Sequence, residues 1–329
     1  MARITKHPDG PVFDCDDEDT ILRAALRAGH GMSYSCNVGS CGNCRFELIE
    51  GEVEHLRLDA PAWSERDLKR NRWLGCQARP LGDCVVKFRD DPAAVSRHRP
   101  VRCHGVVREI RPVTRDMSEF VISVDDDGFL AGQYALITPE GVTGGRAYSM
   151  SNFPGDGQWC FIIKRVPGGA ATGQLFDHLS PGDRIALDGP YGTAWLREDS
   201  PRNLLLLAGG SGLSPMVSIA RGAFARGMLD DRNLMFFYGA RSQGDLFDPE
   251  REFGADLMSR IQFIPVLSEP DTGWTGETGL VHEAAERLCH DLASREIYFA
   301  GPAAMSTAVQ KMVHAAGAGL DQMHFDEFY

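Results

Sequence analysis

The stretch SCNVGSCGNC, residues 35–44, decides the fold of the N-terminal part of this chain. Its cysteines, Cys36, Cys41 and Cys44, follow the spacing C-x4-C-x2-C, and Cys76 stands further downstream. This spacing is typical of plant-type 2Fe–2S sites, in which four thiolates hold two irons. Glycines within the loop let the backbone curl so that its N–H groups point at the sulfurs. The stretch therefore predicts an iron–sulfur cluster, which carries one electron at a time.

A structural zinc site and a set of disulfides are the alternatives for these cysteines. Structural zinc usually shows two short Cys/His pairs, whereas only Cys76 stands downstream here. The other cysteines have no paired spacing and are expected to be small buried hydrophobes. An odd total of nine cysteines also argues against an oxidising compartment. These other cysteines are Cys15, Cys84, Cys103, Cys160 and Cys289.

Length and charge limit the class of protein. The 329 residues suffice for two or three domains. A net charge of −12 makes nucleic acid an unexpected partner, because nucleic-acid binding depends on basic patches. No apolar run has the length of a membrane span, and residues 1–6 lack the apolar core of a signal peptide. We expect a cytoplasmic protein that does not bind membranes.

Hydrophobic patterns divide the chain into three segments. Residues 1–95 combine one helical pattern with alternating strands, and turn residues at 90–94 indicate a linker. Residues 99–200 contain short strands separated by turns, which predicts an antiparallel barrel or sandwich. Residues 201–329 alternate continuous apolar strands with helical stretches, as a parallel α/β domain does.

A glycine-rich turn, GGSGLSP at residues 209–215, follows the first apolar strand of the third segment. Ser214 is expected to cap a helix that starts at Pro215, and such a helix N-terminus attracts phosphate. A dinucleotide pyrophosphate would fit here, and a tight turn without ligand is the alternative. The hydrolase pattern G-x-S-x-G fails at Leu213, and the Rossmann pattern G-x-G-x-x-G fails at Pro215. The turn alone therefore predicts a nucleotide site of unusual type.

Taken together, these motifs resemble the ferredoxin–NAD(P) reductase superfamily, and specifically the reductase components of bacterial multicomponent oxygenases. The resemblance covers nearly the whole chain. It implies a β-grasp 2Fe–2S ferredoxin domain at 1–95, an antiparallel β-barrel FAD domain at 99–200 and a parallel α/β NAD-binding domain at 201–329. The family's cluster ligands fall on the four cysteines quoted above.

The resemblance also implies a flavin site. The family signature R-x-Y-S is present as Arg146-Ala147-Tyr148-Ser149. Arg146 is expected on the FAD pyrophosphate, Tyr148 on the isoalloxazine ring and Ser149 near its reactive nitrogen. A second stretch, residues 163–172, resembles the family's strand followed by G-G-x-x-S, with threonine in place of serine. Its expected contacts to the cofactor are Ile163, Lys164, Val166, Gly169, Ala171 and Thr172.

The nucleotide residues implied by the resemblance are Gly209, Gly210, Ser211, Gly212, Arg241 and Gly301. The family's C-G-P-x-x-M is present at residues 300–305 with Ala300 in place of cysteine. The aromatic tail implies that Phe328 or Tyr329 covers the flavin, and a frayed terminal strand is the alternative. Only one cation, Arg241, follows the second apolar strand, and Asp245 comes soon after it, which favours NADH over NADPH.

The activity that follows is an NADH-dependent reductase, an enzyme in which Tyr148, Ser149 and Phe328 stand at the reacting centre. FAD takes a hydride from NADH and passes single electrons through the cluster to a ferredoxin, of which a Rieske type is one form, or to an oxygenase component. An aromatic hydrocarbon monooxygenase is the expected system, and the reductase is expected to be a monomer. A flavin reductase with a structural cluster and a non-enzymatic iron–sulfur redox sensor are the rival hypotheses.

Overall fold

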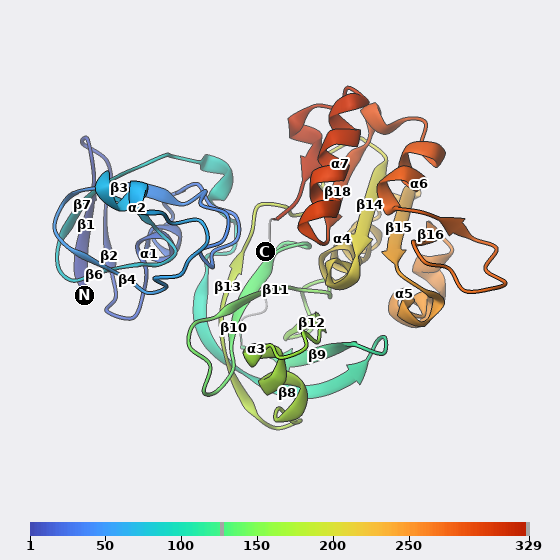
Figure 1. The fold of residues 1–329 in the computed structure, drawn as a ribbon, viewed down its shortest axis with the longest axis horizontal. Helices are drawn as coiled ribbons and strands as arrows, with labels where there is room; N and C mark the ends of the chain where they lie inside the picture. The colour runs from blue at the N-terminus through green and yellow to red at the C-terminus, as the bar shows by residue number, and fades with distance from the viewer. Residues whose placement is uncertain (126–127, 327–329) are drawn as a thin grey trace. The chain divides into compact units, whose positions relative to one another are not determined.

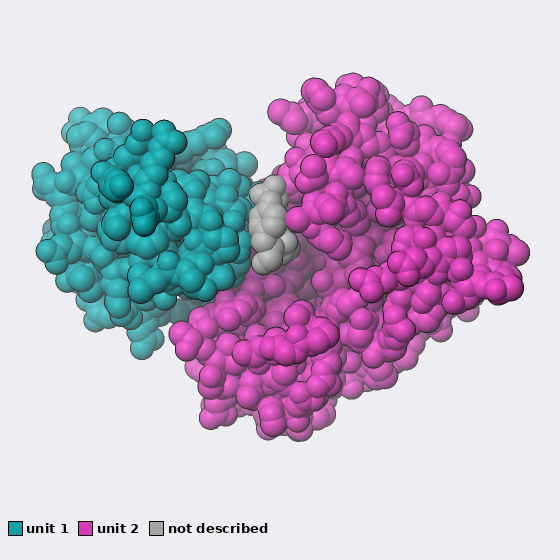
Figure 2. Space-filling model, in the orientation of Figure 1, with its two compact units in different colours: residues 1–102, 188–193, 327–329 teal, residues 103–187, 194–326 magenta. Residues whose placement is uncertain are grey.

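The computed structural model describes residues 1–125 and 128–326, which form two compact units (Figures 1 and 2). Unit 1 contains residues 1–102 and 188–193, and unit 2 contains residues 103–187 and 194–326. Figure 2 colours unit 1 teal and unit 2 magenta. No helix in these described ranges is both long and apolar enough to cross a bilayer.

Unit 1 is built on a five-stranded sheet with the strand order β2-β1-β7-β3-β5. Strands β1 and β7 are parallel, and the other neighbours are antiparallel. Strands β4 and β6 form a separate two-stranded sheet in the same unit. The elements are β1 (Ala2–Lys6), β2 (Val12–Cys15), α1 (Ile21–Arg27), β3 (Arg45–Glu50), β4 (Val53–His55), α2 (Glu65–Lys69), β5 (Arg72–Leu74), β6 (Ala78–Pro80), β7 (Cys84–Phe88) and the 3-10 turn η1 (Pro92–Ala94).

Helix α1 forms where the sequence predicts it. Thr20 is its N-cap residue, and its apolar side chains, Ile21 and Leu22 among them, are buried. Gly29 follows the helix with φ of +81°, a left-handed conformation that ends helices readily when glycine supplies it. The loop that follows carries three of the predicted cluster cysteines, so α1 anchors one end of that loop.

The first sheet of unit 2 is six-stranded and barrel-like, with the order β11-β10-β13-β8-β9-β12. The Ser151 N–H donates to the Cys160 carbonyl at 2.7 Å and so joins the chain after β11 to β12, at the opposite edge of the sheet. A core rich in aromatic and branched side chains fills its interior. The elements are β8 (Val101–Pro112), β9 (Met117–Ser123), β10 (Tyr134–Thr138), β11 (Arg146–Ser149), β12 (Gln158–Lys164), α3 (Ala170–Asp177) and β13 (Arg184–Tyr191).

The second sheet of unit 2 is parallel throughout, with the order β17-β16-β15-β14-β18-β19. Successive residues of β14 face opposite sides, so α4 and α5 cover one face and α6 and α7 the other (Figure 1). The elements are β14 (Leu204–Gly209), η2 (Gly210–Gly212), α4 (Leu213–Ala225), η3 (Met228–Asp230), β15 (Leu234–Ala240), η4 (Gln243–Asp245), α5 (Pro249–Met258), β16 (Ile261–Leu267), β17 (Glu277–Thr278), α6 (Val281–Leu288), η5 (Leu292–Ser294), β18 (Glu296–Ala300), α7 (Ala303–Ala315), η6 (Leu320–Gln322) and β19 (Met323–His324). The predicted fold class is confirmed.

A buried ion network joins the two sheets of unit 2. Arg111 on β8 donates to both carboxylate oxygens of Glu252 on α5, at 2.7 and 2.8 Å, and to Glu119 on β9 at 2.6 Å. Arg221 on α4 lies 3.8 Å from each of these two carboxylates and donates to the Ser151 carbonyl at 3.0 Å. The Glu252 side chain is only 1 % exposed, and that of Glu119 only 5 %. Because buried charges are costly unless they are paired, the network fixes how the sheets pack.

Candidate functional site

The four predicted cluster ligands lie as two pairs in unit 1. Cys36 and Cys41 form one pair, in which the Cys41 backbone N–H lies 3.3 Å from the Cys36 sulfur. Cys44 and Cys76 form the other, with 3.4 Å between their sulfur atoms. Three of these thiols are buried, and Cys41 is half-buried. Two pairs of thiols suit two irons, since a 2Fe–2S core takes four thiolates in all.

Backbone N–H groups of the loop point at the Cys36 sulfur. Those of Ser40 and Cys41 both lie 3.3 Å from it, and that of Val38 lies 3.5 Å away. The Cys41 thiol's hydrogen bond is the main cause that lowers the pKa of Cys36 to about 6; burial opposes this shift and the N–H groups reinforce it. Gly39, with φ of +86°, gives the loop the curl that aims these groups. The loop is therefore built to stabilise negative charge on sulfur.

These residues fit an iron–sulfur cluster better than a single metal ion. In residues 1–125 and 128–326, no three His, Cys, Asp or Glu side chains are grouped as one ion would require. The remaining cysteines are all free thiols. Burial raises the pKa of Cys15 and of Cys160 to about 12, which makes both unreactive. In these ranges, the four predicted ligands are the cysteines that lie in pairs, and the other cysteines stand singly.

The R-x-Y-S residues occupy β11, at the edge of the barrel-like sheet. The Arg146 side chain is exposed, and its Nη1 donates only to carbonyl groups of its own turn, that of Gly144 at 3.0 Å among them. Tyr148 is half-buried, and burial raises the pKa of its hydroxyl to about 12. Ala147 lies between them, and Ser149 is buried at the end of the strand. Within residues 1–125 and 128–326 no carboxylate is paired with this exposed guanidinium, which suits it to a pyrophosphate.

The second flavin stretch runs from β12 into α3. Ile163 points into the barrel core, whereas Lys164 and Val166 are exposed. The Thr172 hydroxyl lies 3.2 Å from both the N–H and the carbonyl of Val166 and so closes the loop before α3. Gly169 caps that helix, and Ala171 is buried in its first turn. The loop is pre-shaped, and its helix N-terminus is available to a phosphate.

The glycine turn lies at the carboxyl end of β14, where the strand order of the parallel sheet reverses. Strands β15 and β16 extend to one side of β14, and β18 lies on the other. Open α/β sheets bind ligands at such a point. Gly209 and Gly212 are buried, Gly210 is half-buried with φ of +57°, and Ser211 is exposed.

Ser214 does not cap the helix, so that prediction is wrong. The turn Gly210–Gly212 runs directly into α4, which begins at Leu213 with Gly212 as its N-cap. The Ser214 hydroxyl instead donates to the Ser149 carbonyl at 2.7 Å and accepts the Ile162 N–H at 3.0 Å. One buried hydroxyl thereby joins the nucleotide turn to both predicted flavin strands.

Gly301 lies beside the glycine turn because β18 is the neighbour of β14. A side chain on Gly301 would come within 2.6 Å of the Met305 sulfur and 3.4 Å of Gly209. A side chain on Gly212 would come within 2.0 Å of the Ala300 carbonyl oxygen. Glycine is required at position 212, where a side chain would meet backbone, whereas at position 301 it would meet the flexible end of Met305. The two motifs of the third segment lie side by side.

Arg241 follows β15 at the same edge of the sheet, and its side chain is exposed. Asp245, four residues later, is paired with Arg115 at 2.6 Å. Burial opposes the charged form of Asp245, but hydrogen bonds from Ser242 and the charge of Arg115 outweigh it and lower the pKa. Sequence reasoning missed Arg115, which comes from the hairpin between β8 and β9 and carries no motif. The predicted tail residues Phe328 and Tyr329 lie outside the described residues.

Three family models match consecutive parts of the chain. A 2Fe–2S iron–sulfur cluster binding domain matches residues 4–81. An oxidoreductase FAD-binding domain matches residues 104–195, and an oxidoreductase NAD-binding domain matches residues 206–311. The cofactors FAD, NAD and a 2Fe–2S cluster, expected from the sequence, are confirmed at the level of these domains.

Whole-length relatives share this order of domains. The chain is 36 % identical over 321 residues to the ferredoxin–NAD(P)(+) reductase CarAd of Metapseudomonas resinovorans, covering 96 % of each chain. It is 36 % identical over 329 residues to the ferredoxin–NAD(+) reductase component of the alkene monooxygenase system of Xanthobacter autotrophicus, covering 97 % of this chain and 98 % of the other. The solved ferredoxin reductase in carbazole 1,9a-dioxygenase superposes with a TM-score of 0.91 at 33 % identity, covering 100 % of this chain and 98 % of that one. This chain belongs to the ferredoxin–NAD(P)+ reductase components of multicomponent oxygenases, a family of oxidoreductases.

Proposed function

We propose that this chain is the NADH-dependent reductase component of an aromatic hydrocarbon monooxygenase, located in the cytoplasm and active as a monomer. Its acceptor is a ferredoxin, with a Rieske type as the leading form, or the oxygenase component itself. The names of the relatives support this, since one serves an alkene monooxygenase system and another is a phenol 2-monooxygenase reductase component. The motifs most resemble the reductase component of toluene 4-monooxygenase, and that particular assignment is part of the proposal.

The observation that carries the proposal is the bridge made by Ser214. Its hydroxyl contacts the Ser149 carbonyl and the Ile162 N–H, at 2.7 and 3.0 Å. Because Ser149 ends the R-x-Y-S strand and Ser214 belongs to the glycine turn, the bridge holds the flavin strands beside the nucleotide site. Hydride transfer needs orientation of the two rings more than acid–base groups. A fixed junction of this kind supplies that orientation.

We assign the flavin to β11 and to the loop before α3. Arg146 binds the pyrophosphate, Tyr148 packs on the isoalloxazine, and Ser149 donates near its reactive nitrogen. The loop from Val166 to Thr172 holds the phosphates against the N-terminus of α3. When bound, FAD takes two electrons as a hydride and gives them up singly, which suits the cluster. Phe328 and Tyr329 stay candidates for the residue that covers the flavin.

We assign the nucleotide to the glycine turn, Arg241 and Gly301, with NADH preferred over NADPH. Asp245 holds Arg115 in an ion pair at 2.6 Å, so Arg115 is not free to bind a 2′-phosphate, and Arg241 is, among the described residues, the one unpaired cation that directly follows β15. We expect kcat/KM for NADH to exceed that for NADPH, and the ratio to shrink in Asp245→Asn. Comparable values for the two cofactors in the parent protein would refute this preference.

The bounds 1–95, 99–200 and 201–329 are proposed for the ferredoxin, FAD and NAD domains. The matched ranges of the family models, 4–81, 104–195 and 206–311, fall inside them. The second and third of these domains pack together within unit 2. Domain bounds matter for experiment, because they decide where the chain can be divided.

A stepwise anaerobic titration with NADH, followed by absorbance and electron paramagnetic resonance, tests the proposal. The flavin absorbance should bleach and the signal of a reduced cluster should then grow. Cys41→Ser should abolish the cluster signal and NADH-driven reduction of cytochrome c, while flavin bleaching persists. Cys84→Ser, the same exchange at a buried cysteine of the same unit that is outside the pairs, is the matched control.

Two results would contradict the proposal in different ways. Undiminished cytochrome c reduction by Cys41→Ser would indicate a flavin reductase with a structural cluster. Absence of bound FAD and of turnover with NADH would indicate an iron–sulfur redox sensor. Circular dichroism of each variant separates loss of electron transfer from loss of folding.

A further inference from the structure

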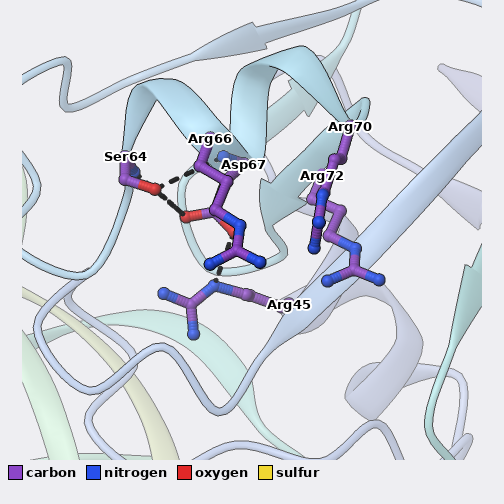
Figure 3. A pocket seen from close by; sticks show the side chains of 6 residues that line it. All are labelled: Arg45, Ser64, Arg66, Asp67, Arg70 and Arg72. Carbon is purple, nitrogen blue, oxygen red and sulfur yellow. Dashed lines mark hydrogen bonds and ion pairs between the residues drawn. The ribbon is translucent and has the colours of Figure 1, made fainter.

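Unit 1 carries a pocket of about 400 Å³ that four arginines line (Figure 3). We call this surface the arginine face; its arginines are Arg45, Arg66, Arg70 and Arg72. They come from β3, from α2 and the residue after it, and from β5. All four side chains are exposed. Positive charge gathered at one place is unexpected on a chain whose net charge is −12.

Most of this charge is not neutralised within the chain. Arg45 is paired with Asp67 at 3.2 Å, and Asp67 also accepts hydrogen bonds from Ser64. In the described ranges, Arg66, Arg70 and Arg72 make no ion pair with a carboxylate. The other carboxylates nearby are Glu65 on α2 and Glu47, which lies opposite Arg72 in the β3–β5 register, while Lys69 adds a further cation. The face therefore keeps a positive excess.

Helix α2 projects from unit 1 instead of packing into it. None of its residues is buried, and Leu68 is 50 % exposed. A capping box at Ser64 and Asp67 nevertheless holds the helix in shape. Exposed arginines together with an exposed apolar side chain on the same short helix have the composition of a protein interface, where arginine is enriched.

Stacked aromatic rings beside the arginine face hold part of its backbone in place. The Trp63 ring lies 4.0 Å from the His55 ring, with 8° between their planes, and 5.3 Å from the Trp73 ring. Trp63 Nε1 donates to the Arg72 carbonyl at 3.0 Å, and Trp73 Nε1 donates to Asn71 at 3.1 Å. The backbone that carries Arg72 is thus held before any partner binds, which lowers the entropy cost of binding.

The arginine face is continuous with the cluster loop. Arg45 directly follows the ligand Cys44, and its guanidinium donates to the Gly42 carbonyl at 3.2 Å. Cys41 is the one half-buried cysteine of the two pairs, and Asn43 beside it is exposed. The edge at which the cluster comes nearest to solvent therefore adjoins the arginines. A partner seated on the arginines would be brought to that edge.

We propose that the arginine face is the docking surface for the acidic face of the protein that receives electrons from the cluster. The inference rests on the proposed function and adds the chemistry of the partner. Arginine forks bind carboxylates in two places at once, and the charges raise the rate of encounter with an acidic protein. Three unpaired arginines spread over a helix and a strand, with Leu68 among them, suit a protein surface better than one small anion.

The test uses the full-length holoprotein with two acceptors of opposite charge. The probes are an acidic Rieske-type ferredoxin and the basic mitochondrial cytochrome c. The variant is Arg66→Glu/Arg70→Glu/Arg72→Glu. The control, Arg3→Glu/Arg97→Glu/Arg99→Glu, changes the net charge equally at three exposed positions of unit 1 outside the arginine face. Circular dichroism and cluster absorbance check folding in both.

At low ionic strength the variant should lower kcat/KM for the ferredoxin about tenfold or more and should raise it for cytochrome c. Both changes should shrink in about 0.5 M salt, because salt screens exposed charges. The control should stay within about twofold of the parent for both acceptors, since its charges lie away from the docking surface. In all three proteins NADH should reduce the cluster to the same extent, which reports the proposed function separately.

Four outcomes would overturn the proposal. Equal slowing by the control would mean that net charge acts, and not this face. An equal response of both acceptors to the variant would mean that charge complementarity is absent. Inhibition of ferredoxin reduction by inorganic phosphate at constant ionic strength, lost in the variant, would assign the pocket to a small anion. A parent protein that reduces neither acceptor would overturn the proposed function along with it.

Discussion

Arginine serves opposite purposes in the two units of this protein. In unit 2, Arg111 and Arg221 lie between buried carboxylates and join two sheets. In unit 1, the arginine face is exposed and mostly unpaired. A buried ion pair must be complete, because an uncompensated charge in the interior is costly. Unpaired charge at the surface costs little and is available to a partner. The contrast predicts that stability depends on the first set and recognition on the second.

The largest effect should come from breaking the buried network. In Glu252→Gln, Arg111 and Arg221 lose a shared counterion, and we expect unit 2 to be destabilised by about 3–5 kcal/mol. Chemical denaturation followed by tryptophan fluorescence measures this. Glu250→Gln changes an exposed glutamate on the same helix and should cost less than about 0.5 kcal/mol. Equal losses in the two variants would show that the network does not hold the sheets together.

A smaller effect is expected at the uncharged hydrogen bonds by which Ser214 joins the two sheets of unit 2. Ser214→Ala leaves the buried Ile162 N–H and the Ser149 carbonyl without their partner, which should cost about 1–3 kcal/mol. Ser259→Ala, at an exposed serine with one hydrogen bond to a carbonyl, should cost less than about 1 kcal/mol. Urea denaturation compares the two. If Ser214→Ala is as stable as the parent, the hydroxyl bridge does not contribute to the free energy of unfolding.

The pH dependence of unit 2 should reveal another buried carboxylate, Glu296, which lies outside that network. Burial opposes its charge, but hydrogen bonds from His324, Ser200 and Arg202 outweigh this and lower its pKa from 4.5. Since the pKa is lower in the folded protein, the stabilisation is complete above pH 4.5 and is lost as the pH falls further. Thermal denaturation between pH 6 and pH 3 should show this loss, and Glu296→Gln should flatten the profile. An unchanged slope in Glu296→Gln would exclude this group; Glu286→Gln is the exposed control.

The smallest effect is expected on the arginine face. Arg66→Ala, Arg70→Ala and Arg72→Ala should each change the free energy of unfolding by less than about 0.5 kcal/mol, because no ion pair within the described residues is lost. The measurement is the denaturant midpoint of the unit 1 transition. A destabilisation above about 2 kcal/mol would mean that these side chains serve the fold, and the contrast between the two units would fail.

The sequence predicted those features that a local pattern encodes. The spacing of the four cysteines predicted an iron–sulfur domain, and continuous apolar runs such as residues 204–208 predicted the parallel sheet. These signals depend on short-range geometry, which one stretch of chain carries by itself. The place at which β14 ends could be predicted in the same way, because glycines directly follow its apolar run.

Features that depend on distant pairing were missed. The arginine face unites residue 45 with residues 66–72 only because β3 and β5 are antiparallel neighbours. The pair of Arg115 and Asp245 likewise joins two different sheets. Ser214 was placed at the right helix but given the wrong role, because the turn Gly210–Gly212 is already helical and frees the hydroxyl for a tertiary bond.

The close approach of Gly212 to Ala300 has a consequence for protein engineering. A methyl group at position 212 would lie 2.0 Å from a carbonyl oxygen of the neighbouring strand end, so a library that varies this turn would mostly yield misfolded clones. Diversity aimed at altered coenzyme use is better placed at Arg241 and Arg115, whose side chains are exposed, than at Asp245, which accepts hydrogen bonds from Ser242 and so caps its own turn.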